Sequence, residues 1–126
     1  MNFNSLQNKV IIITGASSGI GLASAIFALQ NKAKVVLAAR KTDHVKGILN
    51  QNNFEEQSFL IVPTDVSDEE SCKKLIEKTI EKFGSINILI NNAGISMRAT
   101  FKDVDVSVLQ QLMNVNFWGT VYCTKY

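Results

Sequence analysis

A short apolar run that leads directly into three glycines is the feature that most constrains this chain. Val10 to Ile13 is rich in β-branched residues, and the segment Thr14 to Gly21 (Thr-Gly-Ala-Ser-Ser-Gly-Ile-Gly) follows without a gap. Glycine is required where φ is positive or where a side chain would block a ligand. A strand that turns tightly into a helix presents backbone N–H groups to an anion. The segment therefore predicts a strand, a phosphate-binding turn and a helix, and a glycine-rich turn without a ligand is the alternative.

Three further short runs predict strands of the same kind. Together with Val10 to Thr14, they are Lys34 to Ala39, Phe59 to Val62 and Ile86 to Ile90. Each run is continuously apolar rather than alternating, which is typical of parallel strands covered on both faces. Segments with a helical period separate the runs, so the sequence predicts an α/β fold built from βαβ units.

The clearest helical period runs from about Asp68 to Phe83. Ser67 and Glu70 are predicted to form a capping box at its start, and Gly84 is predicted to end it. Lysine and glutamate fill the outer face. One stripe is expected to face the core, and it contains Cys72, Leu75, Ile76, Thr79, Ile80 and Phe83.

Three other helices are predicted with less regular patterns. The helix after Gly19 is apolar nearly all round and is expected to be buried, and Thr42 to Asn53 is a more polar helix. The last helix is expected to begin near Asp105 and to continue to the chain end. On one inward face of it we place Leu109, Leu112, Met113 and Asn116.

Composition excludes several classes of function. The 126 residues carry a net charge of only +2, with acidic and basic residues interleaved, which argues against a nucleic-acid or membrane-surface partner. Cys72 and Cys123 have no CxxC partner, so two free thiols in a reducing cytosol are expected rather than a metal site or a disulfide. Met1 to Lys9 lacks an apolar signal core, and stretches such as Ile20 to Leu29 are too short to span a bilayer. A soluble cytoplasmic protein is expected.

A second motif joins the first. Asn91 to Gly94 (Asn-Asn-Ala-Gly) directly follows Ile88 to Ile90, Asp65-Val66 follows the third predicted strand, and Asn116 lies in the last helix. With the segment Thr14 to Gly21, this pattern resembles the classical short-chain dehydrogenase/reductase family over essentially the whole chain.

The resemblance implies a Rossmann-type doubly wound parallel sheet in three α/β/α layers, ending after the fourth strand and the following helix. It implies one NAD(P)-binding domain over residues 1–126. The implied activity is hydride transfer between a nicotinamide dinucleotide and a small carbonyl or alcohol substrate. Dimers and tetramers are usual in the family, so a homo-oligomer is an option for the full-length protein.

The resemblance also assigns cofactor-binding positions. Asp65 and Val66 match the family's adenine-contacting pair, although Asp65 could equally be a turn or capping carboxylate. Asn91 matches a residue that also stabilises the sheet, so a structural role is the alternative for it. Small Ala93 and Gly94 let the backbone approach the ribose. The phosphate turn supplies Gly15, Ser17, Ser18, Gly19, Ile20 and Gly21.

The end of the second predicted strand favours NADP(H) over NAD(H). Ala39 stands where the family's NAD-preferring members carry aspartate, and Arg40 and Lys41 follow it. The planar fork of arginine pairs with a 2′-phosphate, and lysine adds charge. Ser17 offers a further hydrogen bond to that phosphate. Two solvated charges at a strand end are the alternative explanation.

Of the family's catalytic residues, only one can be placed. Asn116 matches the asparagine that binds a proton-relaying water, and a hydrogen-bonded core asparagine is the alternative. The family's Ser and Tyr-x-x-x-Lys motif cannot be placed, because Lys125 has Val121 at the Tyr position and Ser96 comes too early. His44, the only histidine, is expected to face solvent.

Two further hypotheses follow from these missing residues. The chain could be a non-catalytic nucleotide-binding module, or an inactive fragment that lacks Tyr-x-x-x-Lys. Its last residues carry no helix-stop signal, and a partial sequence is therefore expected.

Overall fold

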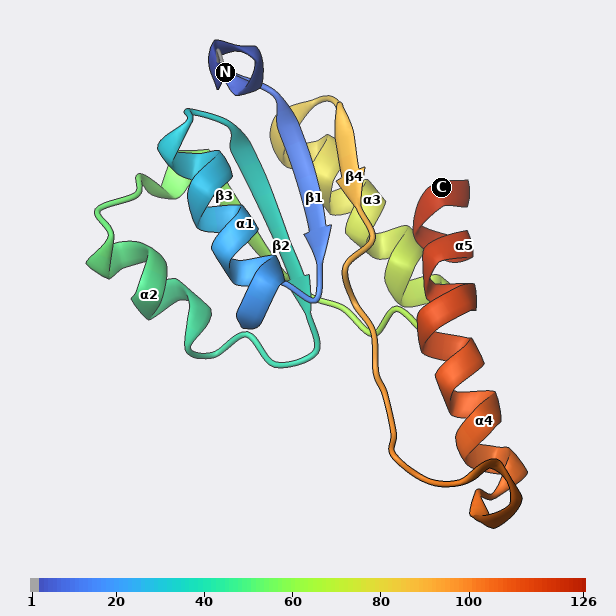
Figure 1. Cartoon of the computed structure of the whole chain (residues 1–126). Helices are drawn as coiled ribbons and strands as arrows, with labels where there is room; N and C mark the ends of the chain where they lie inside the picture. Colours follow the sequence, from blue (N-terminus) through green and yellow to red (C-terminus); the bar gives the residue numbers. More distant parts are fainter. Residues whose placement is uncertain (1–2) are drawn as a thin grey trace.

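A four-stranded parallel sheet in the order β3-β2-β1-β4 forms the centre of the protein (Figure 1). The computed structural model describes residues 3–126, so residues 1 and 2 of the predicted domain lie outside the described residues. The strands are β1 (Val10–Thr14), β2 (Lys34–Ala39), β3 (Phe59–Pro63) and β4 (Ile88–Ile90). The helices are α1 (Gly19–Gln30), α2 (Val45–Gln51), α3 (Glu69–Phe83), α4 (Val106–Met113), the π-helix η4 (Asn114–Trp118) and α5 (Gly119–Lys125), with short 3₁₀ turns at Phe3–Leu6, Glu56–Ser58 and Phe101–Asp103.

Strand order creates a switch point beside β1. The chain adds β2 and β3 on one side of β1 and then returns to place β4 on the other side, where Ile12 pairs with Leu89. In such sheets ligands bind in the crevice outside the carboxyl ends of the strands, at the point where the order reverses. The predicted α/β parallel sheet is confirmed.

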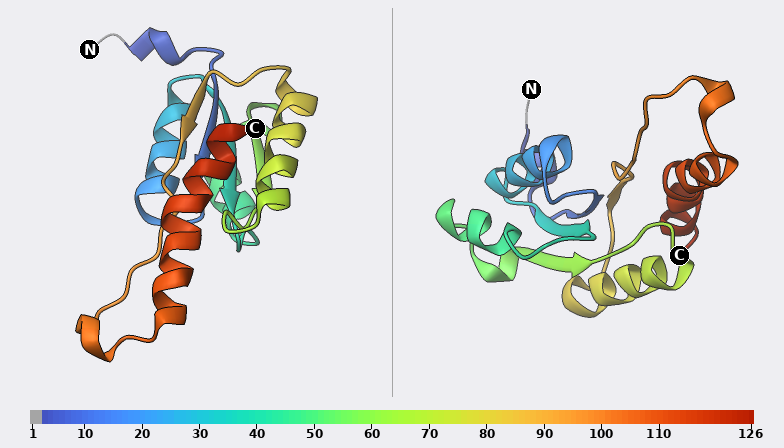
Figure 2. Two further views of the ribbon diagram at one scale, coloured as in Figure 1. Left: turned by 90° about the vertical axis from the view of Figure 1, so that its right-hand side faces the viewer. Right: turned by 90° about the horizontal axis from the view of Figure 1, so that it is seen from below.

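Two apolar clusters cover the two faces of the sheet. Ile11, Ile13 and Val35 face α1 and α2, whereas Ile12 and Val36 face α3 and α5. This alternation follows from the period of two along a strand. Seen from below in the right-hand view of Figure 2, α1 and α3 lie on opposite sides of the sheet. The left-hand view shows the segment through α4 extending beyond the carboxyl ends of the strands. The three-layer α/β/α prediction is thus confirmed.

The strand boundaries differ slightly from the prediction. β3 is one residue longer than expected, and β4 begins at Ile88 rather than at Ile86. Asn87 explains the later start, because its side-chain Oδ1 accepts a hydrogen bond from the Val10 N–H at 2.8 Å. A side chain thus occupies a position that a backbone carbonyl would take in a longer ladder.

The predicted capping box at the start of α3 is wrong. Asp68 is the N-cap and its Oδ2 accepts from the Ser71 N–H at 3.1 Å, while Ser67 donates its hydroxyl hydrogen to Asp65. Asp at the N-cap satisfies a free N–H as well as Ser does, and it lies one residue further along. Gly84 ends the helix with φ of +76°, as predicted. Of the predicted stripe, Cys72, Leu75 and Thr79 are buried, Ile76 and Phe83 are half-buried, and Ile80 is 45% exposed.

Burial of α1 on all sides was also predicted wrongly. Ala25, Ala28 and Leu29 pack on the sheet, but Ile20 is 79% exposed and Phe27 is 45% exposed. One face of α1 packs on the strands, whereas Ile20 and Phe27 lie largely at the surface.

The remaining helices are shorter or less regular than predicted. α2 begins three residues after Thr42, and Asn53 lies outside it in a left-handed turn with φ of +58°. The last helix begins one residue after Asp105, but it contains the π-turn η4, which holds more residues than an α-turn. Of the residues predicted to face inward, Leu109 and Leu112 are half-buried, but Met113 is 52% exposed and Asn116 is also exposed, so the predicted inward face is wrong for these two residues.

The cysteines lie together on the α3–α5 side of the sheet. Cys72 and Cys123 are buried free thiols with their sulfur atoms 3.5 Å apart. Among the residues that the structure describes, no three His, Cys, Asp or Glu side chains are grouped so as to hold a metal ion. No helix within residues 3–126 is long and apolar enough to cross a membrane.

Candidate functional site

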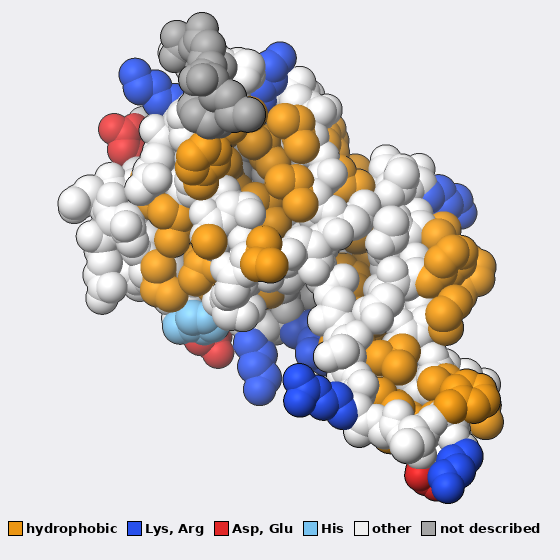
Figure 3. All heavy atoms as spheres, in the orientation of Figure 1, with side chains coloured by type: hydrophobic (Ala, Val, Ile, Leu, Met, Phe, Trp, Pro, Cys, Tyr) orange, Lys and Arg blue, Asp and Glu red, His pale blue; other side chains and the backbone are white. Residues whose placement is uncertain are grey.

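A groove of about 610 Å³ lies at the carboxyl edge of the sheet, where the switch point is found. Figure 3 shows Lys and Arg side chains gathered around the hollow below the sheet. The loops that follow all four strands contribute to the groove, and the last helix adds one residue. Its walls consist of Gly15, Ser17, Ser18, Ala39, Arg40, Lys41, Thr64, Asp65, Val66, Asn92, Ala93, Gly94, Ile95 and Val115.

Close packing explains two of the three motif glycines. Gly15 has φ of +65°, and a Cβ there would lie 2.9 Å from the Ala93 Cα. A Cβ on Gly21 would lie 2.4 Å from the Gly15 carbonyl oxygen and 2.6 Å from Asn92 Nδ2. These glycines allow α1 to pack closely against the loop after β4. Gly15 lines the groove, whereas Gly21 does not.

The first turn of α1 has backbone N–H groups without helical partners. Ser18 is the N-cap, with extended backbone and no side-chain capping bond, and its carbonyl accepts the N–H of Leu22. Among the described residues, the N–H groups of Gly19, Ile20 and Gly21 have no backbone acceptor, so they are available to an anion at the positive end of the helix dipole. Gly19 and Ile20 lie in this turn but outside the groove lining, and a Cβ on Gly19 would meet no atom within 4 Å.

A hydrogen-bond network ties the glycine turn to the loop after β4. The buried Thr14 Oγ1 accepts the backbone N–H groups of Asn92 and Ala93, each at 3.0 Å. Asn92 Nδ2 donates to the carbonyls of Thr14 and Gly15 at 3.0 and 3.3 Å. Asn92 thus lies in the groove, whereas Asn91 donates to Thr124 Oγ1 on α5 at 3.2 Å and lies outside it.

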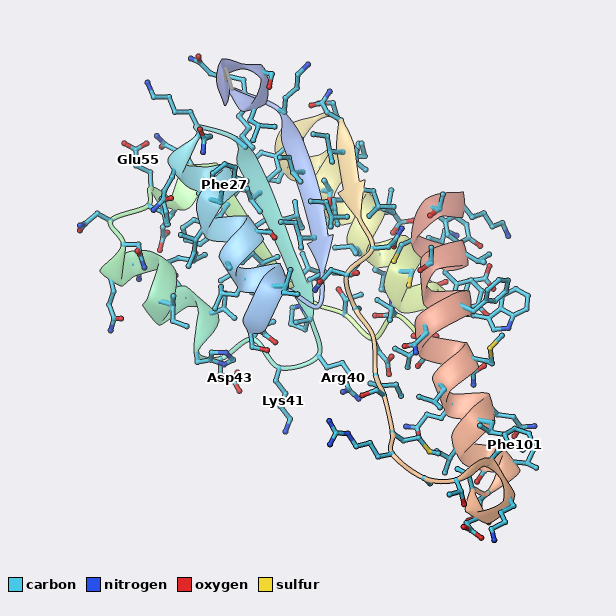
Figure 4. The ribbon with its side chains drawn as sticks, viewed as in Figure 1. Phe27, Arg40, Lys41, Asp43, Glu55 and Phe101 are labelled. Atoms are coloured by element: carbon cyan, nitrogen blue, oxygen red, sulfur yellow. The ribbon has the colours of Figure 1, made fainter. Side chains whose placement is uncertain are left out.

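Two cations stand at the β2 end of the groove. Arg40 and Lys41 are exposed, and Figure 4 shows both on the loop between β2 and α2. Within residues 3–126 neither forms a salt bridge. Ala39, which sequence analysis did not include among the site residues, is buried beside them.

The β3 end of the groove carries a carboxylate. Asp65 Oδ1 accepts from both the N–H and the hydroxyl of Ser67, at 3.0 and 2.7 Å, so it stabilises its own turn while it lines the groove. Val66 beside it is buried. A Cβ on Gly119 would lie 2.8 Å from Val66 Cγ2, so a small residue at 119 lets the last helix pack on this wall.

Asn116 lies in the π-turn η4 and faces the segment after β4. Its Oδ1 accepts the Ile95 N–H at 2.9 Å, and its Nδ2 donates to the Ile95 carbonyl at 2.8 Å. The side chain is exposed and outside the groove lining, while Ile95 and Val115 on either side of the contact line the groove. Both hydrogen-bonding ends of the amide are used by the backbone.

The C-terminal titratable residues form a separate surface cluster. Tyr126 donates its hydroxyl hydrogen to Glu69 at 2.6 Å, and Lys125 lies 3.4 Å from the same carboxylate. The hydrogen bond from Tyr126, supported by Lys125, lowers the pKa of Glu69 below its ordinary value. Tyr122 stacks on Trp118, and none of these residues lines the groove.

Several residues of the groove, and His44 beside it, were not predicted from the sequence. Thr64, Asn92, Ile95 and Val115 line the groove, and only Asn92 belonged to a recognised motif. His44 is exposed, as expected, but its Nε2 lies 2.8 Å from the Ser17 carbonyl oxygen. The two residues are 27 positions apart, and no local pattern connects them.

Comparisons with known proteins agree with this geometry. A family model described as short chain dehydrogenase matches residues 9–126. A protein of Arabidopsis thaliana named 11-beta-hydroxysteroid dehydrogenase-like 2 is 38% identical over 128 residues, which cover 100% of this chain and 42% of that protein. An uncharacterized oxidoreductase of Staphylococcus aureus is 38% identical over 120 residues, covering 95% of this chain and 51% of its own length.

Solved structures of short-chain dehydrogenases and reductases resemble this fold. The 3-ketoacyl-(acyl-carrier-protein) reductase from Brucella melitensis complexed with NADH has a TM-score of 0.88 and 30% identity, over 95% of this chain and 49% of that one. A short chain dehydrogenase from Bacillus anthracis has a TM-score of 0.89 and 33% identity, over 95% and 50%. The chain thus spans about half or less of the length of these relatives.

Proposed function

Since the chain belongs to the short-chain dehydrogenase family, we propose that it forms the single cofactor-binding domain of an NADP(H)-dependent oxidoreductase that acts on a small carbonyl or alcohol substrate. When bound, the nicotinamide would supply or accept the hydride. The observation that carries the proposal is the lining of the groove, which combines Ser18, the N-cap of α1, with Arg40 and Lys41, two cations that form no salt bridge with the described residues.

The glycine turn fits a diphosphate. Gly15 and Gly21 let the turn and α1 pack closely, and the uncapped first turn of α1 offers N–H donors to negative charge. Gly19 and Ile20 lie in the same turn, so we assign them to this part of the site. The Thr14–Asn92 bonds hold the turn in place before a ligand arrives, which lowers the entropic cost of binding.

The two ends of the groove fit the remaining parts of a dinucleotide. Asp65 Oδ2 accepts no hydrogen bond from the described residues, so it remains available to an adenine amine beside the apolar wall of Val66. Ala93 and Gly94 leave room for the nicotinamide ribose. We assign Asn91 a structural role through Thr124, and Asn116 the role of holding the backbone at Ile95.

Selectivity for NADP(H) is proposed to come from Arg40. A guanidinium binds a phosphate through two parallel hydrogen bonds, and Lys41 and the hydroxyl of Ser17 lie along the same groove. The buried Ala39 offers no carboxylate to a ribose 2′-hydroxyl.

A non-catalytic nucleotide-binding module is the second candidate. It is favoured by one observation, since no tyrosine is among the groove-lining residues of the described chain. Expression of the complete reading frame, followed by NADPH oxidation with a panel of aldehydes and ketones, separates the two candidates. Steady turnover supports the oxidoreductase, and tight NADPH binding without turnover supports the module.

Titration with NADPH and NADH, followed by nicotinamide fluorescence, tests the cofactor proposal. Arg40→Asp should weaken NADPH binding roughly ten- to a hundredfold, because a charge-assisted pair is lost and a repulsive charge is added, while NADH binding changes little. Lys74→Asp, on the exposed face of α3, makes the same charge change away from the groove and should alter neither affinity. An equal loss for both nucleotides with Arg40→Asp would contradict the phosphate-pairing role.

A further inference from the structure

His44 connects two loops that line the groove. It is the N-cap residue of α2 but makes no capping bond with its side chain. Instead, its Nε2 lies 2.8 Å from the carbonyl oxygen of Ser17 in the glycine turn. Arg40 and Lys41 lie on the same β2–α2 loop as Asp43 and His44, below the start of α1 (Figure 4).

The chemistry of this contact assigns a proton. A carbonyl oxygen only accepts hydrogen bonds, so His44 Nε2 carries the hydrogen and donates it. A side-chain amide can make the same bond, whereas an aliphatic side chain cannot. The donor therefore defines which substitutions preserve the contact.

The contact also sets the direction of a peptide plane. In a trans peptide the carbonyl of one residue and the N–H of the next point in opposite directions. Because the Ser17 carbonyl is held toward His44, the Ser18 N–H points away from His44. Ser17 and Ser18 line the groove, and His44 does not.

A flipped peptide would change the groove's preference for charge. With the Ser17 carbonyl released, that oxygen could turn toward the groove and place a partial negative charge beside Arg40. With the carbonyl held, the groove instead presents N–H and O–H donors next to two cations, the arrangement that binds phosphate oxygens.

We propose that His44 is a positioning residue for recognition of the adenosine 2′-phosphate: its hydrogen bond to the Ser17 carbonyl keeps the Ser17 hydroxyl and the Ser18 N–H directed at the phosphate that Arg40 binds. This inference rests on the proposed NADP(H) function and adds a residue that acts without touching the cofactor. A simple structural link between α2 and the glycine turn is the competing explanation. Such a link would affect stability and the binding of both nucleotides alike.

Calorimetric titration with NADP⁺ and NAD⁺ distinguishes the two explanations, in protein expressed from its complete reading frame. His44→Ala should weaken NADP⁺ binding roughly three- to tenfold, the usual value of one hydrogen bond, and NAD⁺ binding less than twofold. His44→Gln, which keeps an N–H donor, should restore NADP⁺ affinity to within about twofold of the wild type. Equal weakening of both nucleotides, or failure of the glutamine variant to restore selectivity while it folds normally, overturns the inference.

A measurement on the wild type covers the case in which the alanine variant does not fold. The amide resonance of Ser18 should shift on binding of NADP⁺ by much more than on binding of NAD⁺. An equal shift with the two nucleotides also overturns the inference. Arg40→Asp separates failure of the proposed function from failure of the role of His44. If the wild type shows no preference for NADP⁺, the proposed function is wrong. If Arg40→Asp loses the preference for NADP⁺ while His44→Ala keeps it, only the role of His44 is wrong.

Discussion

Thr14 is the residue whose side chain supports the binding turn most directly, and Thr14→Val tests that role. The side chain is 1% exposed, and its Oγ1 accepts two backbone N–H groups, those of Asn92 and Ala93, each at 3.0 Å. Valine has nearly the same shape but cannot accept a hydrogen bond. The substitution therefore removes these two acceptor contacts and a long donated hydrogen bond to the Ile90 carbonyl at 3.5 Å, without opening a cavity.

The expected loss of stability follows mainly from the Ala93 N–H, which is left without a partner, because the Asn92 N–H still donates to the Ile90 carbonyl at 3.1 Å. Both residues are half-buried, so the unsatisfied Ala93 N–H is expected to cost about 2 kcal/mol and the loss of one of the two acceptors of Asn92 about 0.5 kcal/mol. The added methyl group offsets about 0.8 kcal/mol of this cost through burial of apolar surface. The free energy of unfolding should therefore fall by roughly 1.5 to 2 kcal/mol.

Urea unfolding combined with amide hydrogen exchange provides the assay, with Thr14→Ser as the matched control. Serine keeps the hydroxyl and loses only a buried methyl group, which costs about 1 kcal/mol. In Thr14→Val the amide of Ala93 should exchange faster than the global loss of stability explains, whereas the amide of Asn92, which still donates to the Ile90 carbonyl, should change less. In Thr14→Ser neither amide should exchange faster than the global loss explains. A valine variant that is more stable than the serine variant, or that keeps full protection at the Ala93 amide, would refute this role of Thr14.

Three further predictions concern other parts of the site and the core. Gly21→Ala should weaken dinucleotide binding more than tenfold by titration, because its Cβ would meet a carbonyl oxygen at 2.4 Å, whereas Gly47→Ala, with open space around it, should leave binding unchanged. Asn116→Ala should speed hydrogen exchange of the Ile95 amide, which donates to the Asn116 side chain. The free energy of unfolding should fall by only about 1 kcal/mol, because the Asn116 side chain is exposed. Unchanged exchange at Ile95 would contradict this role of Asn116. The hydrogen-bonded thiol of Cys123 and burial raise the pKa of Cys72. At Cys72 the unfolded chain therefore ionises before the folded chain, whereas the same hydrogen bond lowers the pKa of Cys123. The stability that the Cys72 thiol contributes is complete below the ordinary thiol pKa and should decline above it, so wild-type stability should fall more than that of Cys72→Ala when urea unfolding is compared below and above that pKa.

The apolar runs, together with the helical segments between them, were sufficient to predict a parallel sheet. Runs such as Val35 to Ala39 can only be buried between two layers, and the segments between them are too long for hairpins, so parallel strands follow. The ends of the elements were less predictable. Asn87 replaces part of a strand with its side chain, and two adjacent residues, Ser67 and Asp68, were both suitable N-caps.

Contacts between distant segments account for the parts of the site that could not be predicted. Asn91 and Asn92 are adjacent and chemically identical, and only the packing of the loop against Thr14 directs Asn92 into the groove and Asn91 toward α5. His44 follows no motif, because its partner is a backbone carbonyl and any residue at position 17 would supply one. The exposed face of α1 could not be recognised either, since apolarity does not reveal whether another element covers it.

A crystal structure of the protein with NADP⁺ tests the central claim most directly. We expect the diphosphate at the first turn of α1 and the adenosine 2′-phosphate within hydrogen-bonding distance of Arg40 and Ser17. A dinucleotide bound outside this groove, or bound within it with Arg40 turned into solvent and the 2′-phosphate unpaired, would contradict the account.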